Sequence, residues 1–347
     1  MIDKIIDLSK NNTNEELDLL EEEVLNSNNA LYIYAYAFYF PNRDLTRLNK
    51  AILNTNNKTY IMHYFNNIQN IDEEEFLSVI LELDCKTIFY SLFGRKSAKD
   101  SSYIKAFTKL LQYPEDTYKN LLVYNYFNVL NKYNEELLNL TKEILPDINK
   151  DNYHELLSKL IKDHSFPIKK HEGFSQNIYK GHNGFKPDII VCHRSFDYGR
   201  IIDNFYSDKA AVSSHFGTSR TGEYLQFLSL DDSPWSNGTT DNPDSGVYYR
   251  HSDNELILSR GSNANYYTYS IENESFDGTL TEVQYQSVLE IAKKIIDYHE
   301  AKYHEKFIID NKHIIGHINV SPLVRTTCPG PNFPLERLIK DLQDYYK

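Results

Sequence analysis

Two histidines and one cysteine in the second half of the chain are of the residue types that bind zinc. His193 ends the apolar segment KPDIIVCH, whose pattern predicts a buried strand. His317 and Cys328 lie on either side of a proline-interrupted loop in GHINVSPLVRTTCPGPNFP. A catalytic zinc site has three protein ligands and keeps its fourth position open to water. These three residues are therefore a candidate metal-ligating set.

The cysteines of the chain do not suggest a disulfide framework. The chain has three cysteines, Cys85, Cys192 and Cys328. They are too few and too dispersed for such a framework, so the thiolate of Cys328 is available to a metal. Cys192 directly precedes His193, and strand alternation places its side chain on the opposite face.

Two other histidines near the candidate ligands are not assigned to the metal. His215 lies in the middle of a predicted strand, VSSHFGTS, and His313 precedes His317 by four residues in a segment predicted to be extended. We expect each of them to support the ligands or to lie on the surface.

Composition and length exclude several classes of protein. A chain of 347 residues predicts two domains. The formal net charge of −12 argues against nucleic acid as a partner, because binding to phosphates draws on Lys and Arg. The N-terminal segment MIDKIIDLSKNNTNEELDLLEEEVL lacks the continuous apolar core of a signal peptide, and even ALYIYAYAFYF is too short to span a bilayer. The sequence therefore predicts synthesis in the cytoplasm and no membrane span.

The two halves of the chain follow different patterns. Residues 1–165 read as successive helices, whereas most Gly and Pro and the only Trp lie beyond them. The polar segment KDHSFPIKKHEGFSQN separates the halves. We predict an all-α domain over residues 1–165 and a second domain over residues 166–347.

The helical half contains an apparent internal repeat. At one constant offset, ALYIYAYAFYFPNRDLTRLNKAIL aligns with KTYIMHYFNNIQNIDEEEFLSVIL, so that Asp44 matches Asp72 and Ile52 matches Ile80. KTIFYSLFGRKSAKDSSYIKAFTKLL continues the register with an insertion, and residues 118–145 follow it more loosely. Helical pairs of this kind stack into an α-solenoid. An irregular helical bundle with coincidental spacing is the alternative.

The second half alternates between strand and helix patterns. DIIVCH, EYLQFLSL, YTYSIENES and KHIIGH read as strands, and TEVQYQSVLEIAKKIIDYHEAKYH and FPLERLIKDLQDYY read as amphipathic helices. This order predicts an α/β domain with a mixed central sheet flanked by helices.

Several ordered segments of this half resemble the zinc-dependent N-acetylmuramoyl-L-alanine amidases of type 2, the superfamily of phage T7 lysozyme and the peptidoglycan recognition proteins. The resemblance covers roughly residues 178–345. It rests, in order, on IIVCH, on VSSHFGTSRTGEYLQFLSLDDSPWSNG, on NYYTYSIENE, and on GHINVSP followed by CPGPNFP. It implies a Zn²⁺ ion held by His193, His317 and Cys328.

The resemblance also implies residues that assist the metal. Glu272 occupies the acidic position at the end of the family's Ser–Ile–Gly–Ile–Glu strand, and is the implied group for proton transfer. Glu274 shares its face in a strand, so periodicity alone does not separate the two. Asn265 occupies the position of the family's asparagine and is the implied contact to substrate.

A second assisting position lies two residues before the last ligand, where many relatives have Lys and this chain has Thr326. A hydroxyl can hydrogen-bond a developing oxyanion but supplies no full charge. The adjacent Arg325 could substitute for it. Ser214 stands where lysozyme-like members have Tyr, so one oxyanion donor of the family is absent at that position.

The implied function is peptidoglycan hydrolysis. Attack by zinc-bound water would cleave the amide between N-acetylmuramic acid and L-alanine, with Trp235 and Tyr267 flanking the substrate. One alternative is a muropeptide-binding protein without catalysis, as among peptidoglycan recognition proteins. Another is a docking protein whose helical half binds a partner and carries the amidase as cargo.

The predicted lack of an export signal bears on the biological role. It is compatible with a phage or prophage endolysin, with an injected effector that attacks the cell wall, and with a recycling enzyme. The additional helical domain favours the first two. In both, the protein would act on the wall after release or translocation.

Overall fold

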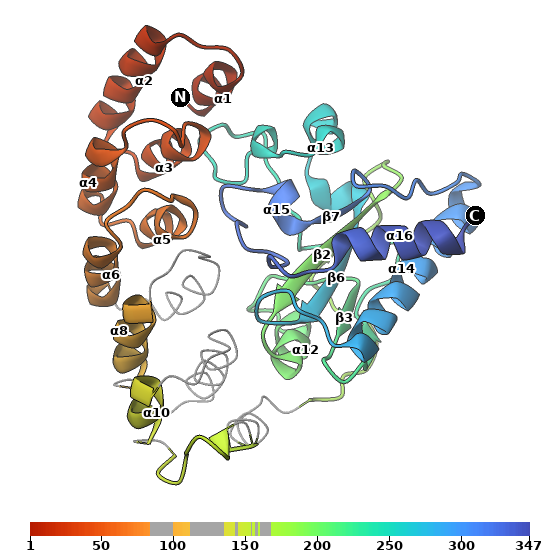
Figure 1. The fold of residues 1–347 in the computed structure, drawn as a ribbon. Coiled ribbons are helices and arrows are strands. Elements are labelled where there is room, and N and C mark those ends of the chain that lie inside the picture. The colour runs from red at the N-terminus through yellow and green to blue at the C-terminus, as the bar shows by residue number, and fades with distance from the viewer. Residues whose placement is uncertain (84–99, 112–134, 143–144, 154, 157–158, 160–167) are drawn as a thin grey trace. The chain divides into compact units, whose positions relative to one another are not determined.

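The computed structural model describes residues 1–83, 100–111, 135–142, 145–153, 155–156, 159 and 168–347 (Figure 1). Cys85 and parts of the predicted repeats beyond residue 83 lie outside these ranges. The chain divides into two compact units, Met1–Ser165 and Phe166–Lys347. Each unit is described by itself below.

The N-terminal unit is helical, as predicted. Its described helices are α1 (Ile2–Lys10), α2 (Asn14–Ser27), α3 (Ala30–Tyr39), α4 (Thr46–Asn54), α5 (Lys58–Asn67), α6 (Glu73–Glu82), α8 (Asp100–Leu111) and α10 (Glu135–Thr141). Consecutive helices pack in pairs, and α3 also contacts α1 and α5. In Figure 1, α2, α4 and α6 follow one another in a row, with α1, α3 and α5 alongside.

Polar caps recur at equivalent places in these helical pairs. The side chain of Asn29 accepts backbone hydrogen bonds at the start of α3, and that of Asn57 does so at the start of α5. Asp44 accepts from the backbone N–H of Thr46 just before α4, and Asp72 caps α6. Each cap satisfies N–H groups that have no partner within the helix. The stacked α-solenoid itself remains a prediction.

The C-terminal unit is built around a mixed five-stranded sheet with the order β4-β3-β6-β2-β7. Its strands are β2 (Ile189–Ser195), β3 (Phe216–Thr218), β4 (Tyr224–Gln226), β6 (Thr268–Glu274) and β7 (Ile314–Gly316). β3, β6, β2 and β7 pair in parallel, and β4 is antiparallel to β3. β1 (Ile178–Tyr179) and β5 (Ser233–Pro234) form a separate pair. The prediction of an α/β domain with a mixed sheet is confirmed.

Two helices cover one face of this sheet (Figure 1). α14 (Glu282–Tyr303) and α16 (Leu335–Tyr345) bury their apolar stripes against it, in a cluster that includes Ile190 and Cys192 of β2. The side chain of Thr281 caps the start of α14. The shorter helices of the unit are α12 (Tyr198–Tyr206), α13 (Glu255–Arg260) and α15 (His317–Val320), with the 3₁₀ turns η1 (Tyr249–His251) and η2 (Ala264–Tyr267).

Alternation along β2 separates its side chains into two groups. Ile190 and Cys192 enter the core beneath α14, whereas Ile189 and Val191 pack in a second cluster with Tyr267 and Ile315. His193 continues the second series. It is therefore directed away from α14, toward the face that carries α15.

The predicted strand KHIIGH is confirmed at its centre, but it does not extend to either histidine. β7 contains only the three residues Ile314–Gly316, and His317 is the first residue of α15. The backbone N–H of Gly316 donates to Asn319 Oδ1 at 3.0 Å, which closes this short helix at its start.

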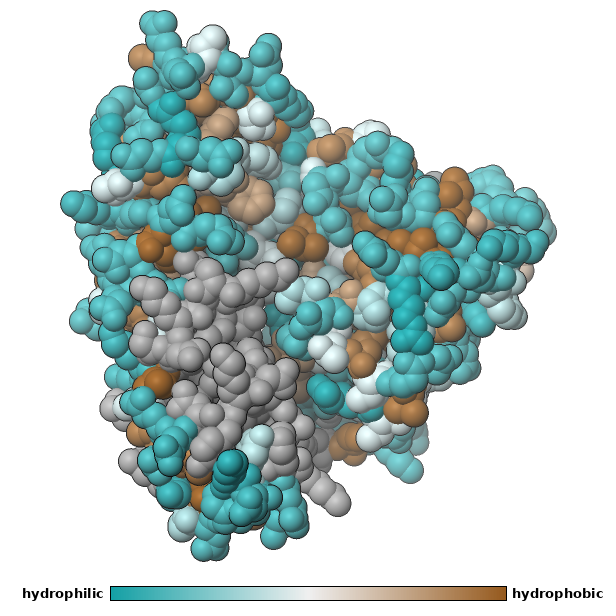
Figure 2. Space-filling view, viewed as in Figure 1, coloured by the Kyte–Doolittle hydropathy of each residue, from teal (hydrophilic) through white to brown (hydrophobic). Residues whose placement is uncertain are grey.

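The visible surface is mostly hydrophilic, with apolar patches between the hydrophilic side chains (Figure 2). Among the helices in the described residues, none combines the length and the apolar character that crossing a bilayer requires.

Candidate metal centre

His193, His317 and Cys328 converge in space although they lie far apart in the sequence. One potential ligand atom from each lies within 4.8 Å of the other two. His193 Nδ1 is 3.9 Å from Cys328 Sγ, and the two imidazole rings meet edge to face with centroids 4.4 Å apart. Both histidines are buried, and the cysteine is half-buried. Such spacing leaves room for one ion between the three side chains.

The parallel pairing of β2 and β7 brings the histidines together. His193 lies near the carboxyl end of β2, and His317 directly follows β7. The carboxyl ends of neighbouring parallel strands meet at one edge of a sheet, where α/β proteins commonly place their sites. The parallel pairing of β2 and β7 therefore brings His193 and His317 close to each other.

Tight packing holds the cysteine segment against the segment of His317. The backbone N–H of Ile318 donates to the carbonyl of Cys328 at 2.8 Å. A Cβ added to Gly316 would lie only 2.5 Å from Cδ of Pro329. Glycine is therefore the residue that allows the chain before His317 to approach the chain after Cys328 so closely.

Arg194 connects three segments around the centre. Its Nε donates to the carbonyl of Thr327 at 2.8 Å, and its Nη2 donates to Thr327 Oγ1 at 3.1 Å. Its Nη1 donates to the carbonyl of Phe276 in the loop after β6. Arg194 thus ties the end of β2 to the residue before Cys328. This role was not predicted, because its only sequence signal is a cation next to His193.

Burial keeps the metal-free ligands uncharged. It lowers the pKa of His193 to about 3 and that of His317 well below its usual value, so both rings are neutral at pH 7. Burial also raises the pKa of Cys328 to about 12, with the charge of Glu272 adding to the effect. A cation that binds here would displace the thiol proton. Two neutral imidazoles and one thiol form a donor set that fits zinc.

Glu272 is the carboxyl group positioned beside this set. It pairs with His193 in the register between β6 and β2, and it is half-buried. Burial raises its pKa to about 8, against the opposing charges of Arg325 and Arg194. Glu274 is engaged elsewhere, because its Oε2 accepts from the backbone N–H of Arg220 at 2.8 Å. The geometry therefore separates two carboxylates that strand periodicity could not.

The turn before Cys328 carries two further polar groups. Arg325 is exposed, and its charge lowers the pKa values of both histidines and of Glu272. A hydrogen bond of 3.1 Å from the N–H of Cys328 to the carbonyl of Arg325 closes the turn. Thr326 lies within it and is half-buried.

Comparison with known proteins agrees with this geometry. Residues 183–331 match the family model described as N-acetylmuramoyl-L-alanine amidase. This part of the chain is a type 2 amidase domain. The match supports a peptidoglycan amidase activity and includes every residue of the centre.

Solved structures similar to the chain include two proteins. A selenomethionine AmpD derivative is 23% identical, covers 48% of this chain and 90% of its own, and gives a TM-score of 0.35. N-acetylmuramoyl-L-alanine amidase LysC from Clostridium intestinale URNW is 18% identical, covers 51% of this chain and 96% of its own, and gives a TM-score of 0.33. No curated protein sequence matches the chain. The domain assignment rests on the family match and not on these likenesses.

Two residues predicted to contact substrate instead support the interior of the amidase domain. Asn265 is buried, and its Oδ1 accepts from the backbone N–H groups of Ser236 at 3.2 Å and Asn237 at 2.6 Å. Tyr267 is fully buried, and its hydroxyl donates to the carbonyl of Ser262. Tyr267 leaves no surface for a substrate, because it ends the turn η2 and packs in the core.

Trp235, the third predicted substrate contact, is half-buried at the edge of an aromatic group. Its ring lies 5.7 Å from that of Tyr179, which lies 5.2 Å from that of Tyr266. Tyr179 is partly exposed. Trp235 therefore belongs to an aromatic group that contains Tyr179 and Tyr266, whereas Tyr267 packs in the core.

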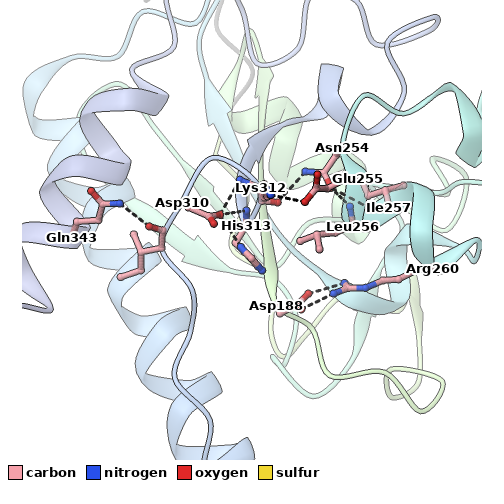
Figure 3. Close-up of polar contacts among 11 residues, drawn as sticks. Asp188, Asn254, Glu255, Leu256, Ile257, Arg260, Asp310, Lys312, His313 and Gln343 are labelled. Carbon is pink, nitrogen blue, oxygen red and sulfur yellow. Dashed lines mark hydrogen bonds and ion pairs between the residues drawn. The ribbon is translucent and has the colours of Figure 1, made fainter. Parts of the chain in front are cut away.

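The two histidines left out of the ligand set have other partners. His215 is buried, with Nε2 at 3.0 Å from the carbonyl of Asp232 and Nδ1 accepting from Ser270 N–H at 3.1 Å. His313 pairs with Asp310 at 2.7 Å, as Figure 3 shows. His313 and His317 flank β7 at opposite ends, four residues and about 13 Å apart at the rise of an extended strand. His313 therefore cannot reach the metal centre.

Proposed function

We propose that this chain is a zinc-dependent N-acetylmuramoyl-L-alanine amidase that cleaves the amide between N-acetylmuramic acid and the L-alanine of the stem peptide. The observation that carries the proposal is the convergence of His193, His317 and Cys328 within a domain of that family. When bound, zinc lowers the pKa of a water molecule and polarises the scissile carbonyl. The three side chains would hold the ion.

Glu272 is proposed to move the protons. Its raised pKa reflects burial in the metal-free protein, and a cation held close to it favours the carboxylate form. The carboxylate can accept a proton from the attacking water and then donate it to the departing amine of L-alanine. Its position opposite His193 in the sheet places it at the same edge as the ligands.

Arg325 and Thr326 are proposed to stabilise the oxyanion that forms when the carbonyl is attacked. Arg325 supplies a full positive charge whose influence reaches the ligands and Glu272. Thr326 supplies a hydroxyl donor from the same turn. Donors fixed before the reaction stabilise developing charge without reorganisation.

The first experiment compares the wild-type chain with Glu272→Gln, each stripped of metal and reloaded with one equivalent of zinc. We expect the wild type to release soluble stem peptides from purified peptidoglycan. The variant should bind zinc equally well and lose about 10²- to 10⁴-fold in rate. Equal rates for the two proteins would contradict the role of Glu272. No release by either protein would contradict the proposed reaction.

We further propose that the protein attacks the cell wall as an endolysin or an injected effector, with the helical unit binding a target or partner. The support is the pairing of an amidase domain with a separate compact unit. Expression of the full chain in the bacterial cytoplasm tests this. We expect lysis only after the membrane is permeabilised, and never with Cys328→Ser. Lysis of the expressing cells while their membrane is still intact would contradict this role.

A further inference from the structure

Three polar side chains are buried in the core beneath the start of α14. Asn273 of β6, Thr218 of β3 and Gln284 of α14 are each fully buried. Thr218 and Asn273 are paired across the two strands, so their side chains lie on the same face of the sheet. That face also carries Ile271 in the apolar cluster against α14. Polar groups in such a position are costly unless their hydrogen bonds are satisfied.

The hydrogen bonds of these three side chains run in one direction. Asn273 Nδ2 faces two backbone carbonyls, which can only accept, so it is the NH₂ end of the carboxamide. It donates to the carbonyl of His193 at 2.9 Å and to that of Ile271 at 3.1 Å. Asn273 Oδ1 accepts from the hydroxyl of Thr218 at 2.8 Å, and Thr218 Oγ1 accepts from Gln284 Nε2 at 3.1 Å. The series of donors thus begins at α14 and ends on the backbone of His193.

This last bond acts on the proposed metal centre from the opposite face of the sheet. His193 pairs with Glu272 between β2 and β6, and Asn273 directly follows Glu272. Strand alternation therefore directs the side chains of Glu272 and Asn273 to opposite faces. By holding the carbonyls of His193 and Ile271, the carboxamide of Asn273 fixes the backbone on both sides of this pair.

The pairing of β2 shows why such a hold is needed at His193. Within the described residues, β7 pairs with β2 only as far as Cys192, whereas β6 continues alongside to the end of β2. His193 therefore has a paired strand on the β6 side alone. The bond from Asn273 strengthens that remaining side, at the residue where the position of the backbone decides the position of a ligand.

We propose that Asn273 is a positioning residue that fixes the backbone of His193 and Glu272 relative to each other, and so sets the geometry of the metal centre. The inference rests on the proposed zinc function of that centre. Metal–ligand distances tolerate only about 0.2 Å, so a strand that carries a ligand must be held closely. Residues that support ligands from outside the ligand set typically contribute about 10- to 100-fold to metal affinity.

The test replaces zinc by Co²⁺ in the full chain, because the visible absorption of bound Co²⁺ reports the arrangement of its ligands. Asn273→Leu keeps the approximate volume of the side chain and removes the donor. We expect Co²⁺ affinity, measured by competition with a chelator, to fall by about tenfold or more. We also expect the spectrum at saturating Co²⁺ to differ from that of the wild type. Asn273→Ala removes the same donor without filling the site, and serves as the second variant if Asn273→Leu does not fold.

Asn177→Leu is the matched control. Asn177 is also buried, and its Nδ2 donates to the backbone carbonyls of Phe205, Ser207 and Val212, none of which belongs to the centre. Urea unfolding of the metal-free proteins measures the stability that each variant loses. Asn177→Leu should lose stability and retain the wild-type Co²⁺ affinity and spectrum.

The outcomes separate this inference from the proposed function. A wild-type chain that binds no Co²⁺ would contradict the metal centre itself, and this inference with it. A wild type that binds Co²⁺, together with Asn273 variants of unchanged affinity, would contradict only the role of Asn273. Weaker binding with a wild-type spectrum at saturation would also overturn that role, because a loss of stability lowers affinity without moving the ligands. The same holds if Asn177→Leu shows equal changes.

Discussion

Replacing Gly316 by alanine isolates the close approach between the two segments that carry His317 and Cys328. The backbone of Gly316 has φ −88° and ψ 159°, which alanine adopts freely, so the substitution introduces no backbone strain. The new Cβ would lie 2.5 Å from Pro329 Cδ and 3.4 Å from the carbonyl oxygen of Cys328. Carbon atoms prefer separations of about 3.5–4.0 Å, so the segments must move apart by roughly 1 Å.

That displacement affects metal binding more than folding. Overpacking of this kind costs about 1–3 kcal/mol of unfolding free energy, because neighbouring groups can shift. Metal–ligand distances tolerate only about 0.2 Å, so a shift of the residue next to Cys328 separates the sulfur from the histidines. We expect zinc affinity to fall by at least about tenfold, a free energy of about 1.4 kcal/mol.

Gly217→Ala is the matched control. Its Cβ would lie 2.8 Å from Phe227 Cε2 and 3.3 Å from Ile201 Cγ2, in the core beside α12. The assay measures urea unfolding of the metal-free proteins and zinc affinity by chelator competition. Both variants should lose stability, and only Gly316→Ala should lose zinc affinity. Wild-type affinity in Gly316→Ala, or equal losses in both variants, would refute the reasoning.

Three further predictions follow from the contacts described above. Because burial raises the pKa of Glu272 from 4.5 to about 8, the folded protein keeps this proton longer than the unfolded chain does. The contribution of Glu272 to the unfolding free energy of the zinc-free protein should therefore decrease as pH rises from about 4.5 to 8, and the difference in urea midpoint between the wild type and Glu272→Gln should change over this range. Arg194→Ala should lower zinc affinity by releasing the Thr327 carbonyl next to Cys328, whereas an unchanged chelator competition curve would contradict that role. Asp72→Ala should cost about 1 kcal/mol of stability by removing the cap of α6, with exposed Glu75→Ala as a control expected to change little in thermal unfolding.

The sheet and the ligand set were predictable because they depend on local patterns. Apolar runs such as KPDIIVCH and KHIIGH predict the strands, and the order of motifs indicates the amidase domain. Parallel pairing of β2 and β7 then brings His193 and His317 to one edge. These features follow from sequence spacing and from general rules of sheet topology.

The supporting residues were not predictable in the same way. Asn237 lies in the irregular segment PWSNG, and its partners Asn265 and Thr268 approach it only through tertiary folding. Tyr267 was predicted to flank the substrate as part of a Tyr-rich strand. It belongs to the turn η2, where strand alternation does not apply, and its ring is fully buried.

The most direct test of the central claim is mass spectrometry of purified peptidoglycan digested by the zinc-loaded full chain, with Cys328→Ser in parallel. The proposed function predicts stem peptides with a new L-alanine amino terminus from the wild type alone. Peptides cut at any other bond, or release by Cys328→Ser at the wild-type rate, would contradict a metal-dependent N-acetylmuramoyl-L-alanine amidase.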